Sequence, residues 1–227
     1  MLEIIYQDQY LVAVNKPHGM FVHKTYLDPY ATEFVVQILR DQIGQWVYPI
    51  HRLDRKTAGV LLLALDKETL VTMNHQFEAR NIDKRYLAIV RGYSNDEGTI
   101  DYPVCNDSGN LQDAVTHYRT LLQSEIDLPQ GKHQTSRYSL VQAQPVTGRT
   151  HQIRKHLSHI FHPIIGDRPH GCNKQNKLFL EKFELNTMML HAHQLTFAHP
   201  YTQAEITLKA DPSSEFQRMQ QALQLIQ

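Results

Sequence analysis

The stretch IHRLDRKTAGVLLLALD, residues 50–66, joins a charged cluster to a continuous apolar run. The run 58–65 has the length of one strand, and an apolar run without alternation is typical of a strand buried on both faces. In the cluster, the carboxylate of Asp54 stands between Arg52 and Arg55. Such a carboxylate is either a loop residue neutralised by its neighbours or an ionised group placed to attack a substrate. In the second case the arginines would hold an anionic substrate.

Length and composition favour one globular catalytic domain over residues 1–227. The chain has 227 residues, of which 41% are apolar. No apolar run approaches the roughly 20 residues that span a bilayer, and the first residues lack the pattern of a secretory signal. The cysteines, Cys105 and Cys172, are far apart in the sequence. These features predict a reduced protein of the cytoplasm without a membrane partner.

The order of elements predicts an α+β fold, with a largely antiparallel mixed sheet flanked by helices. Residues 3–16 read as two short strands around a turn. Thr32 is expected to cap a helix that ends at Gly44, Asp66 to cap the next helix, and Thr150 to cap a helix over 151–160. Further strands are expected, including one over 114–122 and one over 136–146 on either side of a loop at 127–134.

The charge of the chain is balanced overall but segregated along the sequence. Lysine and arginine number 23, as do aspartate and glutamate. The segment 147–182 is basic, with only Asp167 and Glu181 as acids; its cations are Arg149, Arg154, Lys155, Arg168, Lys174, Lys177 and Lys182. A basic face on a neutral protein predicts a local, salt-sensitive attraction for a polyanion such as RNA.

The sequence carries no recognisable cofactor or metal motif. It has no G-x-G-x-x-G and no G-x-x-x-x-G-K-[ST] to cradle phosphates, so no nucleotide cofactor is expected. His151, His156, His159 and His162 lie close together in sequence, but their spacing fits no known metal site. We therefore expect these histidines to be structural or to contact RNA.

Three polar residues lie on well-formed elements: Asp54 before the buried strand, Tyr86 within a strand, and Arg154 on a helix. Taken singly, each reads as structural, since an aspartate near arginines is usually an ion pair and a strand tyrosine usually packs. Together with the basic segment they favour a functional site.

Five blocks of the sequence resemble the RluA-type pseudouridine synthase family, in the family's own order. The block that contains Asp54 resembles the family pattern H-R-L-D-x-x-T-S-G. In chain order, the blocks are VNKPHGMFVH (14–23), HRLDRKTAG (51–59), KRYLAIVRG (84–92), TGRTHQIRKHLSHIFHPIIGD (147–167) and LHAHQLTFAHP (190–200). Ala58 departs from the usual serine, and we expect little consequence.

The resemblance implies an isomerase that converts uridine in RNA to pseudouridine without a cofactor, on the pseudouridine synthase catalytic fold. It assigns the catalytic role to Asp54. A carboxylate suits this role because it can act as a nucleophile or as a base. The resemblance also implies that Tyr86 stacks on uracil and that Arg154 pairs with the carboxylate. Attack at C1′, attack at C6 and a glycal route remain open.

The resemblance also implies how RNA is bound. The uridine is flipped out of its helix, and Arg52 fills the vacated stack. Leu190 is expected to form the apolar wall under the base. Arg149, Lys155, Lys174 and Lys177 are candidates for phosphate contacts. No obligate protein partner is evident.

One branch of the family, which acts at uridine 65 of certain tRNAs, fits best, through GDRPHG (166–171) followed by QN. Two alternatives remain. A large-subunit rRNA pseudouridine synthase shares the catalytic blocks, and an RNA-binding protein could keep the fold without catalysis. No S4 RNA-binding domain is expected, because the catalytic blocks begin at once.

Overall fold

A computed structural model describes residues 1–24, 30 and 32–226 of the chain. The chain divides into two compact units. Unit 1 comprises Met1–Lys84 and Ala192–Pro212, and unit 2 comprises Arg85–His191 and Ser213–Gln227. Each unit thus contains segments that are distant in sequence, and each is described by itself.

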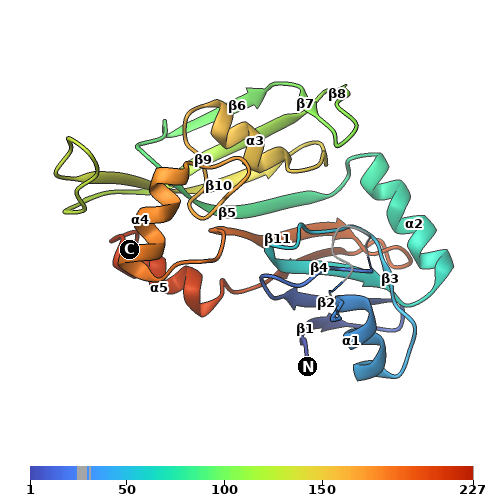
Figure 1. The fold of residues 1–227 in the computed structure, drawn as a ribbon. Helices are drawn as coiled ribbons and strands as arrows, with labels where there is room; N and C mark the ends of the chain where they lie inside the picture. Colours follow the sequence, from blue (N-terminus) through green and yellow to red (C-terminus); the bar gives the residue numbers. More distant parts are fainter. Residues whose placement is uncertain (25–29, 31, 227) are drawn as a thin grey trace. The chain divides into compact units, whose positions relative to one another are not determined.

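The strands of unit 1 follow the order β1-β2-β4-β11, with β3 added to β4 and β12 added to β11 (Figure 1). Their bounds are β1 (Glu3–Gln7), β2 (Leu11–Lys16), β3 (Tyr48–Pro49), β4 (Ala58–Ala64), β11 (Leu190–Ala198) and β12 (Glu205–Lys209). The ladders β1–β2, β2–β4, β3–β4 and β11–β12 are antiparallel. Every residue of β4 is buried, which confirms the strand predicted from its apolar run.

The described residues of unit 1 include the helices α1 (Val35–Ile43) and α2 (Lys67–Glu78). Asp66 caps α2 as predicted, and its carboxylate accepts a hydrogen bond from the Thr69 backbone N–H at 2.7 Å. Gly44 ends α1 in the left-handed conformation, also as predicted. The predicted cap at Thr32 is wrong, because α1 begins after Phe34, whose side chain cannot cap and is buried instead.

Unit 2 contains the strand order β5-β10-β9-β6, all paired antiparallel, and a separate hairpin of β7 and β8. The bounds are β5 (Asp83–Arg91), β6 (Glu97–Asp101), β7 (Val104–Cys105), β8 (Leu111–Gln112), β9 (Val115–Ile126) and β10 (Ser136–Pro145). The long β9–β10 ladder follows the strands predicted on either side of the loop near 127–135.

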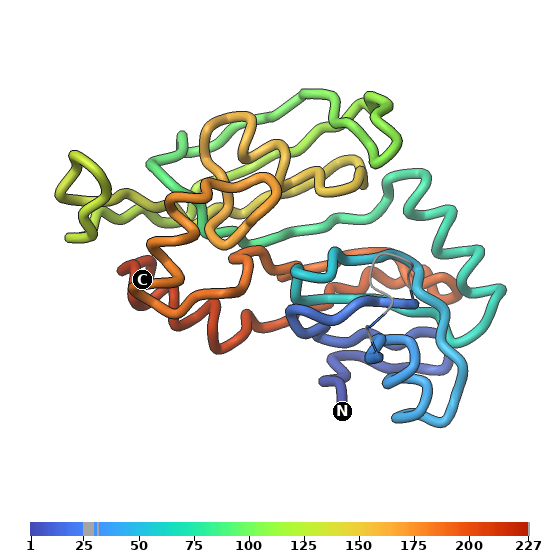
Figure 2. Tube along the Cα trace, in the orientation of Figure 1, coloured from blue at the N-terminus to red at the C-terminus, as the bar shows by residue number. Residues whose placement is uncertain are grey.

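The helices of unit 2, within the part that the structure describes, are α3 (Gln152–His159), α4 (Asn173–Phe183) and α5 (Ser214–Ala222). Helix α3 contacts β9 and β10. Helices α4 and α5 lie side by side in Figure 2, and Arg218 on α5 donates to the Phe183 carbonyl at 2.7 Å. The cap predicted at Thr150 is displaced by one residue. The N-cap is His151, in the left-handed conformation and without a side-chain capping bond.

Within the described residues, no helix combines the length and the apolar character needed to cross a membrane.

Candidate active site

Asp54 lies in unit 1, in the short loop that joins β3 to β4. The Thr57 backbone N–H donates to the Asp54 carbonyl at 3.0 Å, which closes a tight turn just before the buried strand. The Asp54 side chain is half-buried, whereas Arg52 and Arg55 are exposed. The rigid strand therefore presents the carboxylate at its start, at the boundary with solvent.

His51 anchors this loop rather than adding charge to it. Its Nε2 atom accepts a hydrogen bond from the Leu62 backbone N–H at 3.1 Å, and its ring stacks on Phe77 of α2. Burial lowers the pKa of His51 to about 4, and the nearby cation of Lys84 adds to the effect. The imidazole is therefore neutral at physiological pH, and the acceptor role of Nε2 agrees with that state.

Lys16, which sequence reasoning did not single out, binds the Asp54 loop to the segment that follows β2. Its ammonium is fully buried and donates to the carbonyls of Pro17, Met20 and Arg55 at 3.0, 2.8 and 3.2 Å. Burial lowers the pKa of Lys16 to about 7, and the carboxylate of Asp54 opposes that shift. A lysine in an otherwise apolar strand, before a proline, was the signal available in the sequence.

In unit 2, the loop before α3 is held by the side chain of Gln152. Its carbonyl oxygen accepts from the Thr147 hydroxyl at 2.6 Å and from the Arg149 backbone N–H at 3.0 Å. Its amide donates to the Val115 carbonyl and the Thr116 hydroxyl, both at 2.9 Å. All four bonding positions of this buried amide are thus used, which fixes the loop carrying Arg149 on β9.

Arg154 is buried on α3 and forms a bidentate ion pair with Asp167. Its Nε and Nη2 atoms donate to the two carboxylate oxygens of Asp167 at 2.8 Å each, and the side chains are 5% and 1% exposed. Asn176 on α4 fixes the Asp167 turn by donating to the Asp167 carbonyl and accepting from Gly166 N–H. This pairing fixes the plane of the Arg154 guanidinium. Asp167 was not identified from the sequence as a partner of Arg154. The pairing of Arg154 with Asp54 stays a prediction.

Tyr86 and Leu190 also belong to unit 2. Tyr86 lies on β5 opposite Ala143 of β10 and is partly buried against the hydrophobic core. Leu190 is 4% exposed and is part of that core. A stacking role for Tyr86 and a base-contacting role for Leu190 stay predictions.

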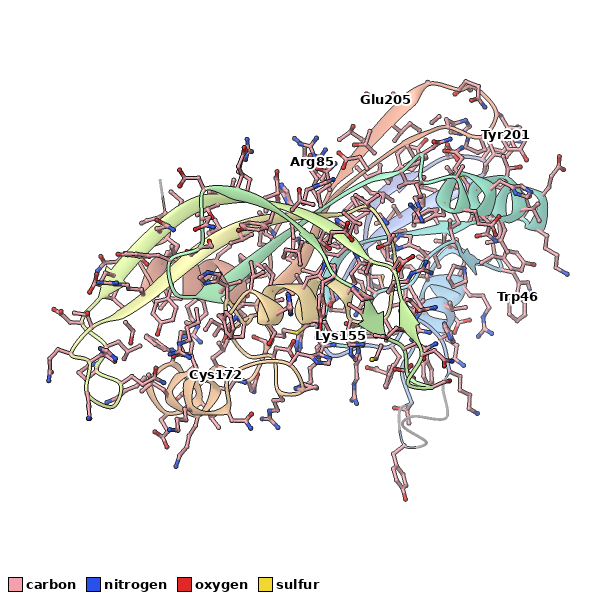
Figure 3. All side chains as sticks on the ribbon, turned by 90° about the horizontal axis from the view of Figure 1, so that it is seen from above. Trp46, Arg85, Lys155, Cys172, Tyr201 and Glu205 are labelled. Carbon is pink, nitrogen blue, oxygen red and sulfur yellow. The ribbon has the colours of Figure 1, made fainter. Side chains whose placement is uncertain are left out.

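The predicted phosphate-binding residues differ in the contacts that their side chains make within the protein. Arg149 Nε donates to the Asp113 carbonyl at 3.2 Å, and Lys155 on α3 (Figure 3) donates to the Cys105 carbonyl at 2.5 Å. Lys177 lies 3.7 Å from Glu181, in an exposed pair one helical turn apart. Lys174 is exposed near the start of α4.

The clustered histidines form separate pairs instead of one centre. His151 Nδ1 lies 2.9 Å from His170 Nε2, and His159 stacks on Tyr102. His156 is buried between the Thr116 hydroxyl and the Tyr102 carbonyl, both at 2.9 Å. Among the described residues, no group of three or more His, Cys, Asp or Glu side chains is arranged to hold a metal ion.

Comparison with known proteins gives a consistent result. The model of the family described as RNA pseudouridylate synthase matches residues 10–159. A protein named tRNA pseudouridine synthase C from Vibrio vulnificus is 46% identical, over 96% of this chain and 94% of its own length. A protein of the same name from Pasteurella multocida is 50% identical, over 92% and 90%.

Among solved structures, Human RNA Pseudouridylate Synthase Domain Containing 4 matches with a TM-score of 0.75 at 26% identity, covering 98% of this chain and 93% of its own. Human RNA Pseudouridylate Synthase Domain Containing 1 matches with a TM-score of 0.72 at 23% identity, covering 100% and 96%. These likenesses confirm the α+β fold predicted from the sequence.

Proposed function

The chain belongs to the RNA pseudouridylate synthase family and is an isomerase that forms pseudouridine in RNA; we propose that its substrate is transfer RNA and that it modifies uridine 65. The observation that carries this proposal is the 46–50% identity, over more than nine-tenths of the chain, to proteins named tRNA pseudouridine synthase C. The finer target, uridine 65, rests on the resemblance of the GDRPHG segment.

In the proposed reaction, the bond between N1 of uracil and C1′ of ribose breaks, the base turns, and C5 bonds to C1′. The proton of C5 leaves, N1 gains a proton, and no atom is added overall, so no cofactor is needed. Asp54 supplies the carboxylate that acts on the nucleotide. Its loop is held by His51 and Lys16, so the carboxylate is pre-positioned and little ordering is needed when RNA binds.

The proposed roles of the other residues follow from their chemistry. Tyr86 offers a ring for stacking on uracil and a hydroxyl that can pass the C5 proton. Arg154 would pair with the Asp54 carboxylate, and its two hydrogen bonds to Asp167 fix the direction of its guanidinium. Arg52 is exposed and would occupy the gap left by the flipped uridine, whose extrusion costs a few kcal/mol.

The residues to which we assign roles come from both units, since Asp54 belongs to unit 1 and Tyr86 and Arg154 belong to unit 2. We therefore propose that residues 1–227 act as one catalytic domain. Arg149, Lys155, Lys174 and Lys177 would bind the phosphates of the RNA, and Leu190 would lie against the base. We propose that the protein acts on tRNA in the cytoplasm, without a cofactor or an obligate protein partner.

Release of tritium from C5-labelled uridine tests the proposal directly. The purified protein is incubated with unmodified tRNA or unmodified large-subunit rRNA, both labelled at C5. We expect release from tRNA, and we expect Asp54→Asn to lower it by at least about 1,000-fold, because the carboxylate reacts directly. Asp211→Asn is a matched control, since Asp211 is an exposed carboxylate of the same unit.

The other outcomes separate the alternatives. Release from rRNA alone would keep the chemistry but contradict the tRNA substrate. Binding of RNA without release from either substrate would favour an RNA-binding protein that has kept the fold. Mapping the pseudouridine in the reacted tRNA then tests position 65.

A further inference from the structure

A pocket of about 450 Å³ lies in unit 1, next to the Asp54 loop. It is lined by residues 18–21, which follow β2, by Tyr30, Thr32 and Glu33 before α1, and by Arg55. Pockets of roughly 300–1,000 Å³ accept small-molecule ligands, so this one has room for a single nucleotide. Arg55 directly follows Asp54, which places their Cα atoms about 3.8 Å apart.

Arg55 is held in a fixed position at the pocket wall. Its guanidinium lies over the ring of Phe21, 4.8 Å from the ring centroid. Its Nε donates to the Gly19 carbonyl at 2.9 Å, and the Gly19 N–H donates to the Arg55 carbonyl at 2.8 Å. Stacking uses the face of a guanidinium, whereas phosphate is bound along its edge, so Arg55 can do both.

The pocket wall carries the cation of Arg55, and two further lysines, Lys16 and Lys56, lie near its residue His18. The pKa of His18 is lowered to about 4, first by burial and then by the cations of Lys16, Lys56 and Arg55. Arg55 and Lys56, which act on His18 in this way, would also attract an anion placed beside it. Glu33 supplies the negative charge among the described lining residues, and it is exposed at the rim. There it can accept hydrogen bonds from a ribose hydroxyl or a base.

We propose that this pocket holds a nucleotide of the substrate RNA beside the uridine that reacts, with its backbone phosphate bound by Arg55. The proposal rests on the proposed function, because it takes RNA as the substrate. Because the pocket lies next to the Asp54 loop, a nucleotide bound there would affect how the reacting uridine is placed. A phosphate fixed at Arg55 would set how far the flipped uridine can enter the site and would help to select the position that is modified.

The phosphate can be located by pairing variants with chemically altered RNA. A set of synthetic tRNA stem-loops, each with one neutral methylphosphonate linkage near the reacting uridine, is titrated against each variant in fluorescence anisotropy. With the unsubstituted protein, we expect one linkage to weaken binding about tenfold, as expected for one charge-assisted contact. Arg55→Gln should weaken binding to unaltered RNA about tenfold and lose further sensitivity to that linkage. Arg55→Lys, which keeps the charge, should retain the sensitivity.

Arg40→Gln is the matched control, because Arg40 also lies over an aromatic ring, 5.2 Å from the centroid of Trp46 (Figure 3), and should behave as the unsubstituted protein. Thermal melting checks that Arg55→Gln is folded. If the variant keeps its sensitivity at every linkage, Arg55 only ties the loops together, and the pocket is not a phosphate site. If the unsubstituted protein neither binds nor converts unaltered RNA, it is the proposed function that fails.

Discussion

The ion pair between Arg154 and Asp167 lies where water cannot screen it, since the two side chains are 5% and 1% exposed. Loss of one partner from such a pair leaves the other charge buried without compensation, which is far more costly than loss of an exposed pair. In the proposed mechanism, Asp167 would act through Arg154, as a positioning residue. The proposed role of Arg154 requires it to keep one direction, and Asp167 supplies the two bonds that fix it.

Asp167→Asn is expected to remove one of those two bonds and the compensating charge. We expect kcat for tritium release to fall about 10- to 100-fold with little change in KM, because RNA binding relies on other contacts. The free energy of unfolding in urea should fall by about 3 kcal/mol.

Glu181→Gln is the control for this prediction, because it breaks the exposed Lys177–Glu181 pair in the same unit, and it should change the free energy of unfolding by less than about 0.5 kcal/mol. A purely structural role for Asp167 would lower stability and leave kcat per folded molecule unchanged.

At this scale the sequence identifies the candidate site residues better than the contacts that support them. Asp54, Arg154 and Asp167 all lie in the quoted blocks, but none of the block patterns indicates that Arg154 pairs with Asp167. This pairing depends on the turn that Asn176 holds, and Asn176 lies on α4, a helix that the sequence did not predict. Partners that meet through tertiary structure leave no local pattern.

Among the elements, β4 and the loop before it show how one strand positions a site. His51 accepts from Leu62 of β4, and this bond requires an unprotonated Nε2 atom. Because the pKa of His51 is about 4 in the folded protein and ordinarily 6.5, the unfolded chain binds more protons between these values. The free energy of unfolding must therefore fall as the pH drops from 6.5 toward 4.

Comparison with His51→Gln isolates this effect, because the glutamine oxygen can accept the same bond without titrating. We expect the unsubstituted protein to lose about 3 kcal/mol more than the variant between pH 6.5 and 4, measured by urea unfolding at each pH. Parallel pH curves for the two proteins would show that His51 is not held neutral by the fold.

Gly59 is a position in β4 that leaves no room for a side chain. Its φ is +112°, and a Cβ atom there would lie 2.2 Å from the Ala192 carbonyl oxygen on β11. We expect Gly59→Ala to lower the free energy of unfolding by at least about 3 kcal/mol. Gly44→Ala is the control, because Gly44 also has positive φ but no atom within 4 Å of its Cβ position, and it should cost about 1 kcal/mol. Similar losses for both variants, in chemical unfolding, would contradict the close approach.

The start of a helix was predictable where a side chain accepts a hydrogen bond from one of the first backbone N–H groups, as Asp66 does at the start of α2. They were not predictable where tertiary contacts decide, as at Phe34, which precedes α1 and is buried. The same holds for His151, whose left-handed backbone starts α3 after the loop held by Gln152.

Over the whole molecule, a net charge of zero coexists with a basic segment, so RNA affinity should depend on a few local phosphate contacts. We expect Lys174→Gln to reduce the slope of log K against log salt for tRNA binding by about 0.9. Lys209→Gln, an exposed lysine of β12, should leave the slope unchanged. Equal effects of both substitutions would point to a diffuse attraction instead of a defined face.

Unit 1 is built from two segments that are far apart in the sequence, and this affects how the chain folds during its synthesis. Strand β4 is complete at residue 64, but its neighbour β11 begins at residue 190. At about 5–20 residues per second, a ribosome needs roughly 6 to 25 seconds to synthesise the chain between them. During that interval the most apolar strand of the molecule has one edge without its partner. Nascent chains would therefore depend on the ribosome surface or on chaperones to stay apart until the last sixth of the polypeptide emerges.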